Sequence, residues 1–379
     1  MSGINLKVLA ALVAVVVGLV VSSPASATWI VETVVSAGDV GSAAAMDLDS
    51  SGNPHIVYRD RTAPSQIKYI VKSGGAWGTP ETVVTSGYYN TDLVLDSLSS
   101  PHISYASASP YSPSYAYKAG GVWQTKQVDT SGTDTSIALG QDGLARISYV
   151  SSTPTLKYAT WNGTSFAKEP VDSSSSVGRY NSLAIDSQGR PHIAYRDGNL
   201  LALRYSRWTG TAWSTGIVDW VGDVGLFASL ALSASDLPRI AYYDNDNGYL
   251  KYAYNDGTTW YNETVDDGSP DDDYVGKYAS LAIDSAGRPH IAYYNESWGT
   301  LKYARWDGSQ WVTETIIDPD GSYDYGVGCS LHLDALDVPH IAYYDSANRD
   351  LKYAVLPEPA TVALVALGGL GVLLRRRRV

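Results

Sequence analysis

Short runs of alternating apolar and polar residues, separated by tight polar turns, recur along most of the chain. The two clearest copies read SLAIDSQGRPHIAYRD at Ser182–Asp197 and SLAIDSAGRPHIAYYN at Ser280–Asn295. In the first copy, Leu183 and Ile185 lie in a β-rich run that meets a Gly-containing turn, and a second β-rich run follows. This pattern predicts an antiparallel hairpin. Pro191 stands at the start of the second strand, where a missing N–H does least harm.

A second repeated signature follows the first along the chain. It reads LKYARWDGSQWVTETI at Leu301–Ile316, LRYSRWTGTAWSTGIV at Leu203–Val218 and LKYAYNDGTTWYNETV at Leu250–Val265. Each copy again joins two β-rich runs through a short turn with Gly or Thr. A hairpin alone is marginally stable in water, whereas two successive hairpins make a four-stranded unit of roughly 45–50 residues, which resembles a propeller blade.

Seven such units divide the body of the chain, residues 28–355. Their inner strands are expected at Ala44–Asp49, Asp92–Asp96, Ser136–Gly140, Ser182–Asp186, Ser229–Ser233, Ser280–Asp284 and Ser330–Asp334. The strands that follow open at His55, His102, Arg146, His192, Arg239, His290 and His340. Richness in Tyr, Trp and Gly, with no long amphipathic helical pattern, agrees with an all-β protein.

The phase of the repeat predicts how the ring closes. The segment Trp29–Val35 matches the fourth strand of the unit, as in Trp311–Ile317, and Leu351–Val355 matches the third strand. The N-terminal strand therefore completes the last blade, which leaves no open seam. We predict a seven-bladed β-propeller of four-stranded antiparallel blades. A parallel solenoid fits poorly because each unit contains its own antiparallel hairpins.

Residues 1–27 have the features of a secretory signal peptide. Lys7 precedes an apolar run at Val8–Val21, and the segment ends in Ala25-Ser26-Ala27. A basic start, a hydrophobic segment and an Ala-x-Ala site direct export and cleavage. The mature chain is expected to begin near Thr28.

Residues 356–379 combine three further features. Pro357-Glu358-Pro359 precedes the apolar run Ala360–Leu374, and a basic tail follows. This order resembles the PEP-CTERM sorting signal of exported bacterial proteins. The resemblance implies transient membrane retention, cleavage by an exosortase-type enzyme, and a place at the surface or in the matrix of an exopolysaccharide producer. The alternative is a simple C-terminal anchor. The residues expected to act in sorting are Pro357, Glu358, Pro359, Arg375, Arg376, Arg377 and Arg378.

Charge and cysteine content exclude several classes of function. The chain has 27 basic and 39 acidic residues, and setting aside Lys7, Glu358 and Arg375–Arg378 leaves 22 against 38 in the body. Such an acidic surface repels phosphate backbones, so no nucleic acid is expected as a partner. The single cysteine, Cys329, rules out an internal disulfide and is expected to be a small buried residue rather than a nucleophile.

Candidate catalytic and metal-binding residues are weakly marked. Histidines open the second strand in five units, but one per blade places them around a ring, and a structural donor role fits both His and the Arg found elsewhere. His332 lies within an inner strand and is expected near the channel, but it does not form a site by itself. The turns at Asp186–Pro191 and Asp284–Pro289 only superficially resemble the Asp boxes of sialidase-type propellers, so no catalytic residue is assigned.

No cofactor is expected, with calcium as the weaker alternative. Closely spaced oxygen ligands occur in three loops, at Asp244–Gly248, Asp271–Asp273 and Asp318–Ser322. None completes a twelve-residue calcium loop with its closing Glu. Solvated acidic loops are therefore the favoured interpretation.

A face of the ring is the stronger candidate for binding. Loops after the second and fourth strands emerge on the same face, where aromatic residues stand beside acids and amides. Rings stack on the C–H faces of sugars and polar groups bind their hydroxyls. Packing between blades is the alternative for the repeated tyrosines. The predicted ligand-binding residues are Tyr89, Arg196, Asp197, Trp220, Tyr243, Asp244, Tyr294, Trp298, Tyr344 and Asp345.

The sequence thus favours an exported, non-catalytic binding or scaffold protein at the cell surface or in the extracellular matrix. Its expected partners are an extracellular polysaccharide or a surface protein, the processing enzyme, and the membrane before cleavage. One alternative is a glycoside hydrolase or polysaccharide lyase on the same fold, which requires converging acids at the channel mouth. Another is a purely structural or protein-binding propeller.

Overall fold

The computed structural model of the protein describes residues 28–107, 111–316 and 325–357, without the side chains of residues 88, 89 and 325. The predicted signal peptide and residues 358–379 of the predicted sorting segment lie outside this range. Residues Trp29–Pro357 form one compact unit. Within the described ranges no helix is long and apolar enough to cross a membrane.

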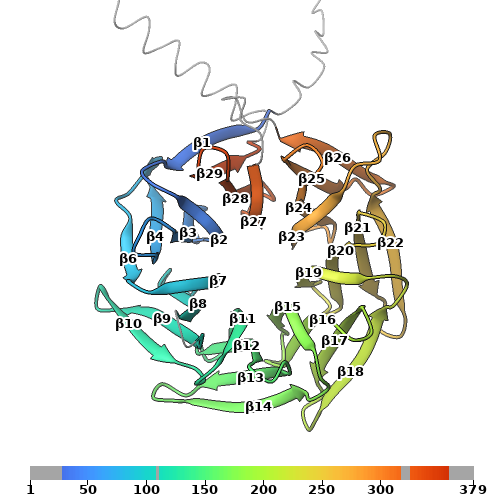
Figure 1. Ribbon diagram of the computed structural model, residues 1–379, viewed down its shortest axis with the longest axis horizontal. Helices are drawn as coiled ribbons and strands as arrows, with labels where there is room; N and C mark the ends of the chain where they lie inside the picture. The colour runs from blue at the N-terminus through green and yellow to red at the C-terminus, as the bar shows by residue number, and fades with distance from the viewer. Residues whose placement is uncertain (1–27, 108–110, 317–324, 358–379) are drawn as a thin grey trace, which may run out of the picture. The chain divides into compact units, whose positions relative to one another are not determined.

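Seven antiparallel sheets stand around a central channel (Figure 1), which confirms the predicted propeller. The inner strands are β2 (Val40–Leu48), β7 (Gly87–Leu95), β11 (Gly132–Leu139), β15 (Val177–Ile185), β19 (Val224–Leu232), β23 (Val275–Ile283) and β27 (Tyr325–Leu333). The second strands are β3 (Pro54–Asp60), β8 (Pro101–Ser107), β12 (Ala145–Ser151), β16 (Pro191–Asp197), β20 (Pro238–Asp244), β24 (Pro289–Asn295) and β28 (Pro339–Asp345). Blades 1 to 7 are numbered in this order.

The outer half of each blade follows the same plan. The third strands are β4 (Gln66–Ser73), β9 (Pro113–Ala119), β13 (Leu156–Trp161), β17 (Ala202–Trp208), β21 (Tyr249–Asn255), β25 (Thr300–Trp306) and β29 (Asp350–Val355). The fourth strands are β5 (Ala76–Trp77) with β6 (Glu81–Val84), β10 (Val122–Gln127), β14 (Phe166–Asp172), β18 (Trp213–Asp219), β22 (Trp260–Asp266), β26 (Trp311–Ile316) and β1 (Ile30–Val35).

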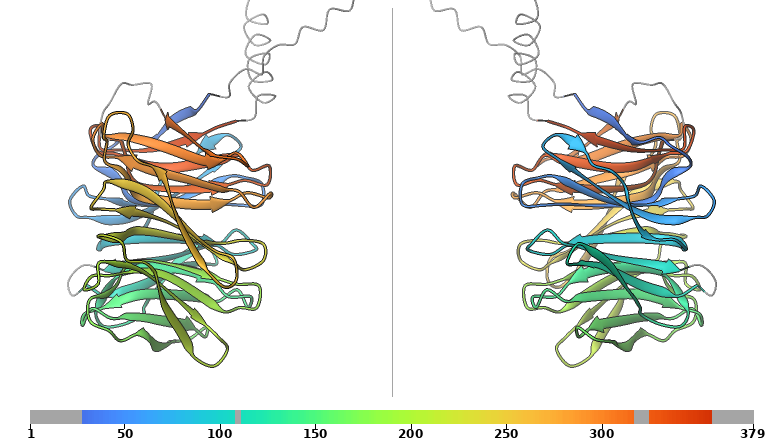
Figure 2. Two further views of the ribbon diagram at one scale, coloured as in Figure 1. Left: turned by 90° about the vertical axis from the view of Figure 1, so that its right-hand side faces the viewer. Right: turned by 90° about the vertical axis from the view of Figure 1, so that its left-hand side faces the viewer.

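The strands cross the thickness of the ring in both side views of Figure 2, so the loops lie at two opposite faces. We call the face formed by the loops after the second and fourth strands the upper face, and the other the lower face. The turns after the first and third strands form the lower face.

The N-terminal strand closes the ring as predicted. Strand β1 pairs antiparallel with β29, with Ile30 opposite Val355 and Val31 opposite Ala354. Blade 7 therefore has the order β1-β29-β28-β27. Because its outer strand comes from the start of the body, separating the ends of the body would require breaking a sheet.

Two details of the strands differ from the sequence prediction. The fourth strand of blade 1 is split into β5 and β6, and Pro80, which cannot donate to a ladder, lies between them. The inner strands begin before the predicted points; β15 starts at Val177 rather than Ser182. The added residues include a bulge, where the two-residue alternation that marks a strand is interrupted.

The hydrophobic core lies between neighbouring blades rather than within one blade. One cluster joins Leu203 and Tyr205 of blade 4 to Leu230, Ile240 and Tyr242 of blade 5. At every interface an aromatic residue that opens a fourth strand packs against a third-strand tyrosine of the preceding blade, with centroids 5.2–5.7 Å apart. These pairs are Trp29–Tyr303, Trp77–Tyr353, Trp123–Tyr69, Phe166–Tyr115, Trp213–Tyr158, Trp260–Tyr205 and Trp311–Tyr252.

Buried carboxylates link the blades near the upper face. Asp219, at the end of the fourth strand of blade 4, accepts hydrogen bonds from Tyr242 Oη at 2.6 Å and Lys251 Nζ at 2.5 Å in blade 5. The same Asp–Tyr–cation arrangement, which we call the inter-blade clasp, recurs at three further interfaces. Its other carboxylates are Asp129, Asp172 and Asp266.

The repeated histidines are structural, as the sequence favoured. His192 Nδ1 lies 2.5 Å from Tyr205 Oη, and its Nε2 lies 3.3 Å from Asp186 in the turn below. Equivalent contacts join His290 to Tyr303 and Asp284. Each histidine therefore ties a turn of the lower face to the third strand of its own blade.

Serines connect the inner strands around the channel. The hydroxyl of Ser229 accepts the backbone N–H of Leu281 in the next blade at 3.0 Å, and Ser280 does the same for Leu331 at 2.9 Å. The ring is completed across the closure, where Ser330 accepts the N–H of Met46 at 3.1 Å. This repeat explains the Ser that precedes the Leu in the SLA motif.

We predict that Asp219→Asn destabilises the protein by about 2–4 kcal/mol, because it leaves the partly buried Lys251 ammonium without its charged partner. Burial alone would raise the pKa of Asp219, but hydrogen bonds from Lys251 and Tyr242 outweigh it and hold the pKa below its usual value. Denaturant unfolding measures the loss. Asp271→Asn, at an exposed acid, is the control and should change stability by less than about 0.5 kcal/mol. Equal effects of the two changes would contradict the clasp.

We also predict that stability decreases as the pH falls below about 6.5. Burial lowers the pKa of His192 and His290, and the neighbouring carboxylates offset this only in part. As the pH falls, these histidines therefore bind protons in the unfolded chain before they do so in the folded chain. The stability that they contribute above the unfolded pKa is lost as the pH falls towards the folded pKa. Denaturant unfolding between pH 7.5 and 5 tests this. His192→Gln should make the slope shallower, and a flat profile for the unchanged protein would refute the mechanism.

Candidate functional site

Most residues predicted to form a glycan-binding face are buried. Tyr243 is 1 % exposed, Tyr294 7 % and Tyr344 4 %. The expectation that these rings face solvent is wrong, because Tyr243 packs against Phe227, Tyr294 packs against Tyr278, and the Tyr344 hydroxyl donates to Asp39. The packing alternative holds for them. Burial also raises the pKa of Tyr243 and of Tyr344 to about 12, with the Asp39 carboxylate adding to the effect on Tyr344.

The acids beside these tyrosines are also buried, and they stabilise turns. Asp197 accepts the N–H groups of Asn199 and Leu200 at 3.0 and 2.9 Å. Asp244 accepts hydrogen bonds from the backbone and side chain of Asn247 at 3.2 and 2.9 Å. Asp345 does the same for Asn348. These carboxylates were predicted to bind ligand, but their oxygens are engaged within their own loops.

Two of these findings bear on the calcium alternative. The loop at Asp244–Gly248 has its first carboxylate committed to Asn247. In the described part of the chain no three His, Cys, Asp or Glu residues gather in a manner suited to a metal. The loop at Asp318–Ser322 lies outside the described residues, so calcium there stays untested.

Arg196 serves an inter-blade ion pair. Its guanidinium lies 2.5 Å from Asp223 of the loop that enters blade 5, and the side chain is largely buried. The predicted ligand contact of Arg196 is therefore available only if this ion pair opens. The backbone of Tyr89 lies in β7 opposite Ala106, and its side chain is outside the description, so its predicted role is untested.

Two predicted residues do stand exposed on the upper face. Trp220 is 74 % exposed and Trp298 56 % exposed. Tyr274, which sequence reasoning did not select as a binding residue, is 53 % exposed and its backbone N–H is bonded to Ser297, the neighbour of Trp298. Ligand binding by Trp220 and Trp298 stays a prediction, and all three rings belong to the sector of blades 4 to 6.

A ring of strained residues surrounds the mouth of the channel. Each inner strand has a bulge whose central residue adopts a positive φ, between 29° and 62°. These residues are Ala43, Asn90, Asp134, Tyr180, Phe227, Tyr278 and Gly328. A left-handed conformation is costly for bulky side chains, of the order of 1–3 kcal/mol, and such outliers cluster at functional sites. Only blade 7 uses glycine here.

A glycine just before the bulge residue, as in Val275-Gly276 of blade 6, lets the inner strand pack closely against the preceding blade. In blade 6, Gly276 has φ near 115°, and a Cβ on it would lie 2.7 Å from the Cα of Leu250 in blade 5. Only glycine allows this close approach between blades. The inner strand is thus anchored just before the bulge, which fixes where the side chain of Tyr278 is directed.

Three neighbouring bulges carry aromatic rings that touch one another. The centroids of Tyr180 and Phe227 are 4.8 Å apart, and those of Phe227 and Tyr278 are 4.5 Å apart. All three rings are half-buried. We call them the mouth arc. Sequence reasoning missed the arc, although the repeated pattern Val-Gly-x-aromatic before the Ser of blades 4, 5 and 6 was the available signal.

The part of the mouth formed by blades 2 and 3, beside the arc, is polar. Asn90 donates to Asp134 at 2.8 Å, and Asn181 donates to the backbone carbonyl of Asp134. Burial raises the pKa of the Asp134 carboxyl, with Arg179 and Asn90 opposing the effect. The channel entrance therefore has an aromatic side and a hydrogen-bonding side, a combination that suits sugars.

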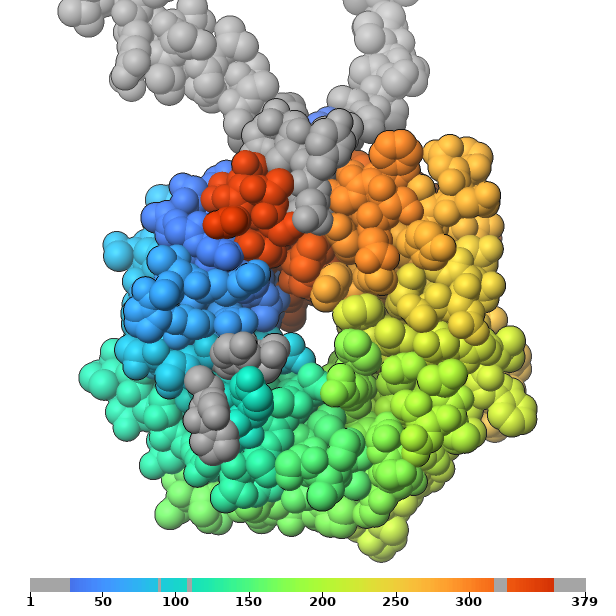
Figure 3. All heavy atoms as spheres, viewed as in Figure 1, coloured from blue at the N-terminus to red at the C-terminus, as the bar shows by residue number. Residues whose placement is uncertain are grey.

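The channel itself is lined by small and polar groups. Figure 3 shows it open at the centre of the ring. Its upper part is a cavity of about 420 Å³ lined by Asn90, Asp92 and Tyr278 among others. Its lower part, about 440 Å³, includes Asp47 and His332, whose Oδ1 and Nδ1 are 3.3 Å apart. His332 thus reaches the channel as expected. Burial raises the pKa of Asp92, which accepts the Ile137 N–H at 2.9 Å.

With this geometry in place, comparison with known proteins identifies the C-terminal segment. Residues 355–378 match the PEP-CTERM protein-sorting motif. The chain carries a PEP-CTERM sorting signal. The protein is therefore exported and is held transiently in the membrane before cleavage, as the sequence predicted. No curated protein matches the chain as a whole.

Solved structures share the propeller fold of this chain at low sequence identity. An ulvan lyase from a new family of polysaccharide lyases is 13 % identical, with a TM-score of 0.60 over 89 % of this chain and 96 % of that chain. An Aleuria aurantia lectin in complex with Fucα1-6GlcNAc is 16 % identical, with a TM-score of 0.52 over 74 % and 98 %. A Dyadobacter fermentans protein of unknown function is 10 % identical, with a TM-score of 0.52 over 70 % and 93 %. These likenesses show the fold alone.

We predict that changing Pro357, Glu358 and Pro359 together to alanine blocks cleavage and leaves a membrane-held precursor in the native host. The reason is that the motif, rather than the apolar segment, supplies the recognition element for processing. Immunoblots of membrane and extracellular fractions measure the outcome. Thr361→Ala, just beyond the motif, is the control and should be processed normally. Release of a triple-alanine protein at the normal size would contradict the sorting role.

Proposed function

We propose that this exported propeller is a binding or scaffold protein that holds extracellular polysaccharide through its upper face. The observation that carries the proposal is the mouth arc: three touching aromatic rings, held on left-handed bulges beside an open channel. The chain accepts backbone strain at these positions, where glycine would relieve it. Phe227 and Tyr278 also pack against Tyr243 and Tyr294, but all three arc rings remain partly exposed at the mouth, where a ligand can use them.

The surroundings of the arc support a sugar as the ligand. Asn90 and Asp134, hydrogen-bonded to each other in the neighbouring blades 2 and 3, offer amide and carboxylate groups for hydroxyls. Trp298 and Tyr274 extend the aromatic surface outward from blade 6, which suits a chain longer than one sugar unit. The export signal puts this face outside the cell, where polysaccharide is available. A lectin and a polysaccharide lyase among the proteins of similar fold agree with this use of the architecture.

We predict that Phe227→Gly weakens polysaccharide binding about tenfold or more, the equivalent of about 1.4 kcal/mol. The change removes the central ring of the arc but eases the left-handed backbone, as Gly328 does in blade 7, so folding should be preserved. Affinity electrophoresis in gels containing candidate polysaccharides, after a glycan array has selected them, measures the effect. Tyr261→Ala, an exposed ring on the outer strand β22, is the control and should bind normally.

Three other outcomes would overturn the proposal. Unchanged binding by Phe227→Gly would remove the arc from the site. No retention of any glycan by the unchanged protein would favour the structural or protein-binding alternative. Release of unsaturated or reducing sugar ends from a bound polysaccharide would favour the lyase or hydrolase alternative, with acids of the channel as the groups to change next.

A further inference from the structure

One blade interface departs from an otherwise regular hydrogen-bonding pattern. At five interfaces the indole N–H of a fourth-strand tryptophan donates to a glutamate in the fourth strand of the preceding blade, at 2.8–3.1 Å. These pairs are Trp29–Glu314, Trp77–Glu32, Trp123–Glu81, Trp213–Glu169 and Trp311–Glu263. The tryptophan ring also covers the tyrosine described above, so the donor and the acceptor are both parts of the interface.

The two remaining interfaces lack this hydrogen bond, but they lack different partners of it. Between blades 2 and 3 both partners are absent, because Phe166 replaces the tryptophan and Lys126 stands at the glutamate position. Between blades 4 and 5 only the acceptor is absent. Trp260 is retained, but Gly216 occupies the position of the glutamate. Among the described residues, Trp260 Nε1 has no hydrogen-bond acceptor.

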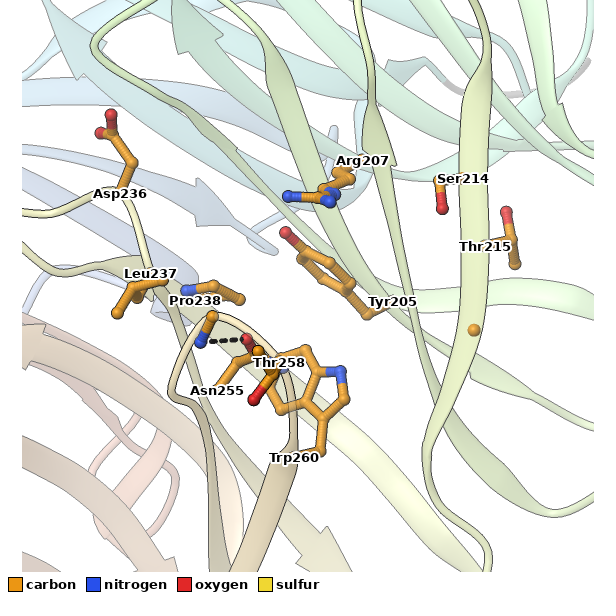
Figure 4. Close-up of a pocket in the computed structure, with 12 residues that line it drawn as sticks. Tyr205, Arg207, Ser214, Thr215, Asp236, Leu237, Pro238, Asn255, Thr258 and Trp260 are labelled. Atoms are coloured by element: carbon orange, nitrogen blue, oxygen red, sulfur yellow. Dashed lines mark hydrogen bonds between the residues drawn. The ribbon is translucent and has the colours of Figure 1, made fainter.

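The missing glutamate leaves a pocket on the outer side of the lower face. It has a volume of about 220 Å³ and is lined by Arg207, Gly216, Asp236, Asn255 and Trp260 among others. Figure 4 shows the indole nitrogen of Trp260 on the side of the ring that faces the strand with Ser214 and Thr215. A Cβ built on Gly216 would meet no atom within 4 Å, so the space that a side chain at this position would enter is open.

One positively charged side chain, that of Arg207, lines the pocket. Arg207, in the third strand of blade 4, is exposed and has no carboxylate partner within the described part of the chain. The one acid among the residues described as lining the pocket, Asp236, is already engaged, since its two oxygens accept hydrogen bonds from the backbone N–H and the hydroxyl of Ser187 at 3.0 and 2.5 Å. The unsatisfied groups of the pocket are therefore donors: a guanidinium and an indole N–H.

We propose that this pocket binds the carboxylate of a uronic-acid unit in an acidic polysaccharide. The ligand carboxylate takes the place that glutamate occupies at the other five interfaces, accepting from Trp260 Nε1 and pairing with Arg207. Charge-assisted bonds of this kind are the strong ones, and arginine is suited to carboxylates. The pocket volume of about 220 Å³ is several times the roughly 30 Å³ share of one water molecule, which leaves room for a carboxylate-bearing group.

This inference refines the proposed function, on which it rests for the choice of a polysaccharide, but it concerns a different face. The mouth arc is on the upper face, and the pocket lies on the lower face. Binding at the two places can therefore be lost separately. A polysaccharide could then contact the propeller at two points, which would raise its avidity without any new contact at the arc.

The test follows the indole N–H resonance of Trp260 in the ¹⁵N-Trp-labelled purified full-length protein, assigned with Trp260→Phe. Titration with oligogalacturonate should shift this resonance, and the fully methyl-esterified oligomer should not. Arg207→Gln should weaken the response at least tenfold. Arg305→Gln, the same strand position in blade 6, where Glu314 is present, is the matched control and should respond normally.

Gly216→Glu provides the sharpest variant. The added carboxylate should accept the Trp260 N–H, move its resonance towards those of the five glutamate-bonded tryptophans without ligand, and abolish the response to oligogalacturonate. Gly216→Ala, which adds no acceptor, should keep the response. Because the glycine has open space and no positive φ, both variants are expected to fold.

Three results would overturn the inference. No shift of the Trp260 resonance with oligogalacturonate would exclude the site, even if the upper face binds polysaccharide. An equal shift with the methyl ester would remove the carboxylate from the argument. A stronger response to a poly-glutamate peptide than to oligogalacturonate would reassign the pocket to acidic protein segments. Conversely, a uronate shift in a protein that retains no polysaccharide on the array would uphold the pocket and refute the proposed upper-face function.

Discussion

The structure depends on the contact between neighbouring blades, and above all on carboxylates that one blade supplies and the next blade satisfies. Asp219 illustrates this dependence: it ends a strand of blade 4 but is neutralised by Lys251 and hydrogen-bonded by Tyr242 in blade 5. A single four-stranded sheet cannot bury both of its faces, and its core residues become buried only against a neighbour. Each blade is thus incomplete alone, and the pairing of β1 with β29 removes the two free ends that a linear array of blades would leave.

Two sets of positions depart from the pattern that the blades otherwise repeat. Tyr180, Phe227 and Tyr278 occupy a bulge that glycine would fill at lower cost, and they do so in three consecutive blades. Gly216 removes an acceptor that five interfaces retain, while leaving its donor in place. The arc rings pack on one another and on Tyr243 and Tyr294 but stay partly exposed, and Trp260 Nε1 has no acceptor among the described residues. Both present groups to the outside that a carbohydrate can use, one set aromatic and the other cationic.

Sequence reasoning recovered the architecture because strands, turns and closure are encoded locally. The Asp-x-x-Gly turns, the Pro that opens the second strand and the out-of-phase first strand each have a local physical signature. It was less successful with the candidate binding residues, since it assigned the second tyrosine of each pair to a ligand and kept packing between blades only as the alternative. Tyr243 and Tyr344 stand beside acids in the sequence, yet both are buried, Tyr243 beside Phe227 and Lys277 and Tyr344 beside Asp39. Burial of this kind depends on residues that are distant in the sequence, which no local pattern reveals.

The sequence by itself determined the repeated unit, the number of blades, the ring closure and the sorting signal, because each depends on a local residue pattern that can be recognised within a single segment. Only the tertiary structure decided which rings are exposed, which carboxylates are free, and which interface lacks its acceptor. These properties belong to pairs of blades: the indole of Trp260 and the gap at Gly216 are 44 positions apart in the chain and become one feature only when blades 4 and 5 meet.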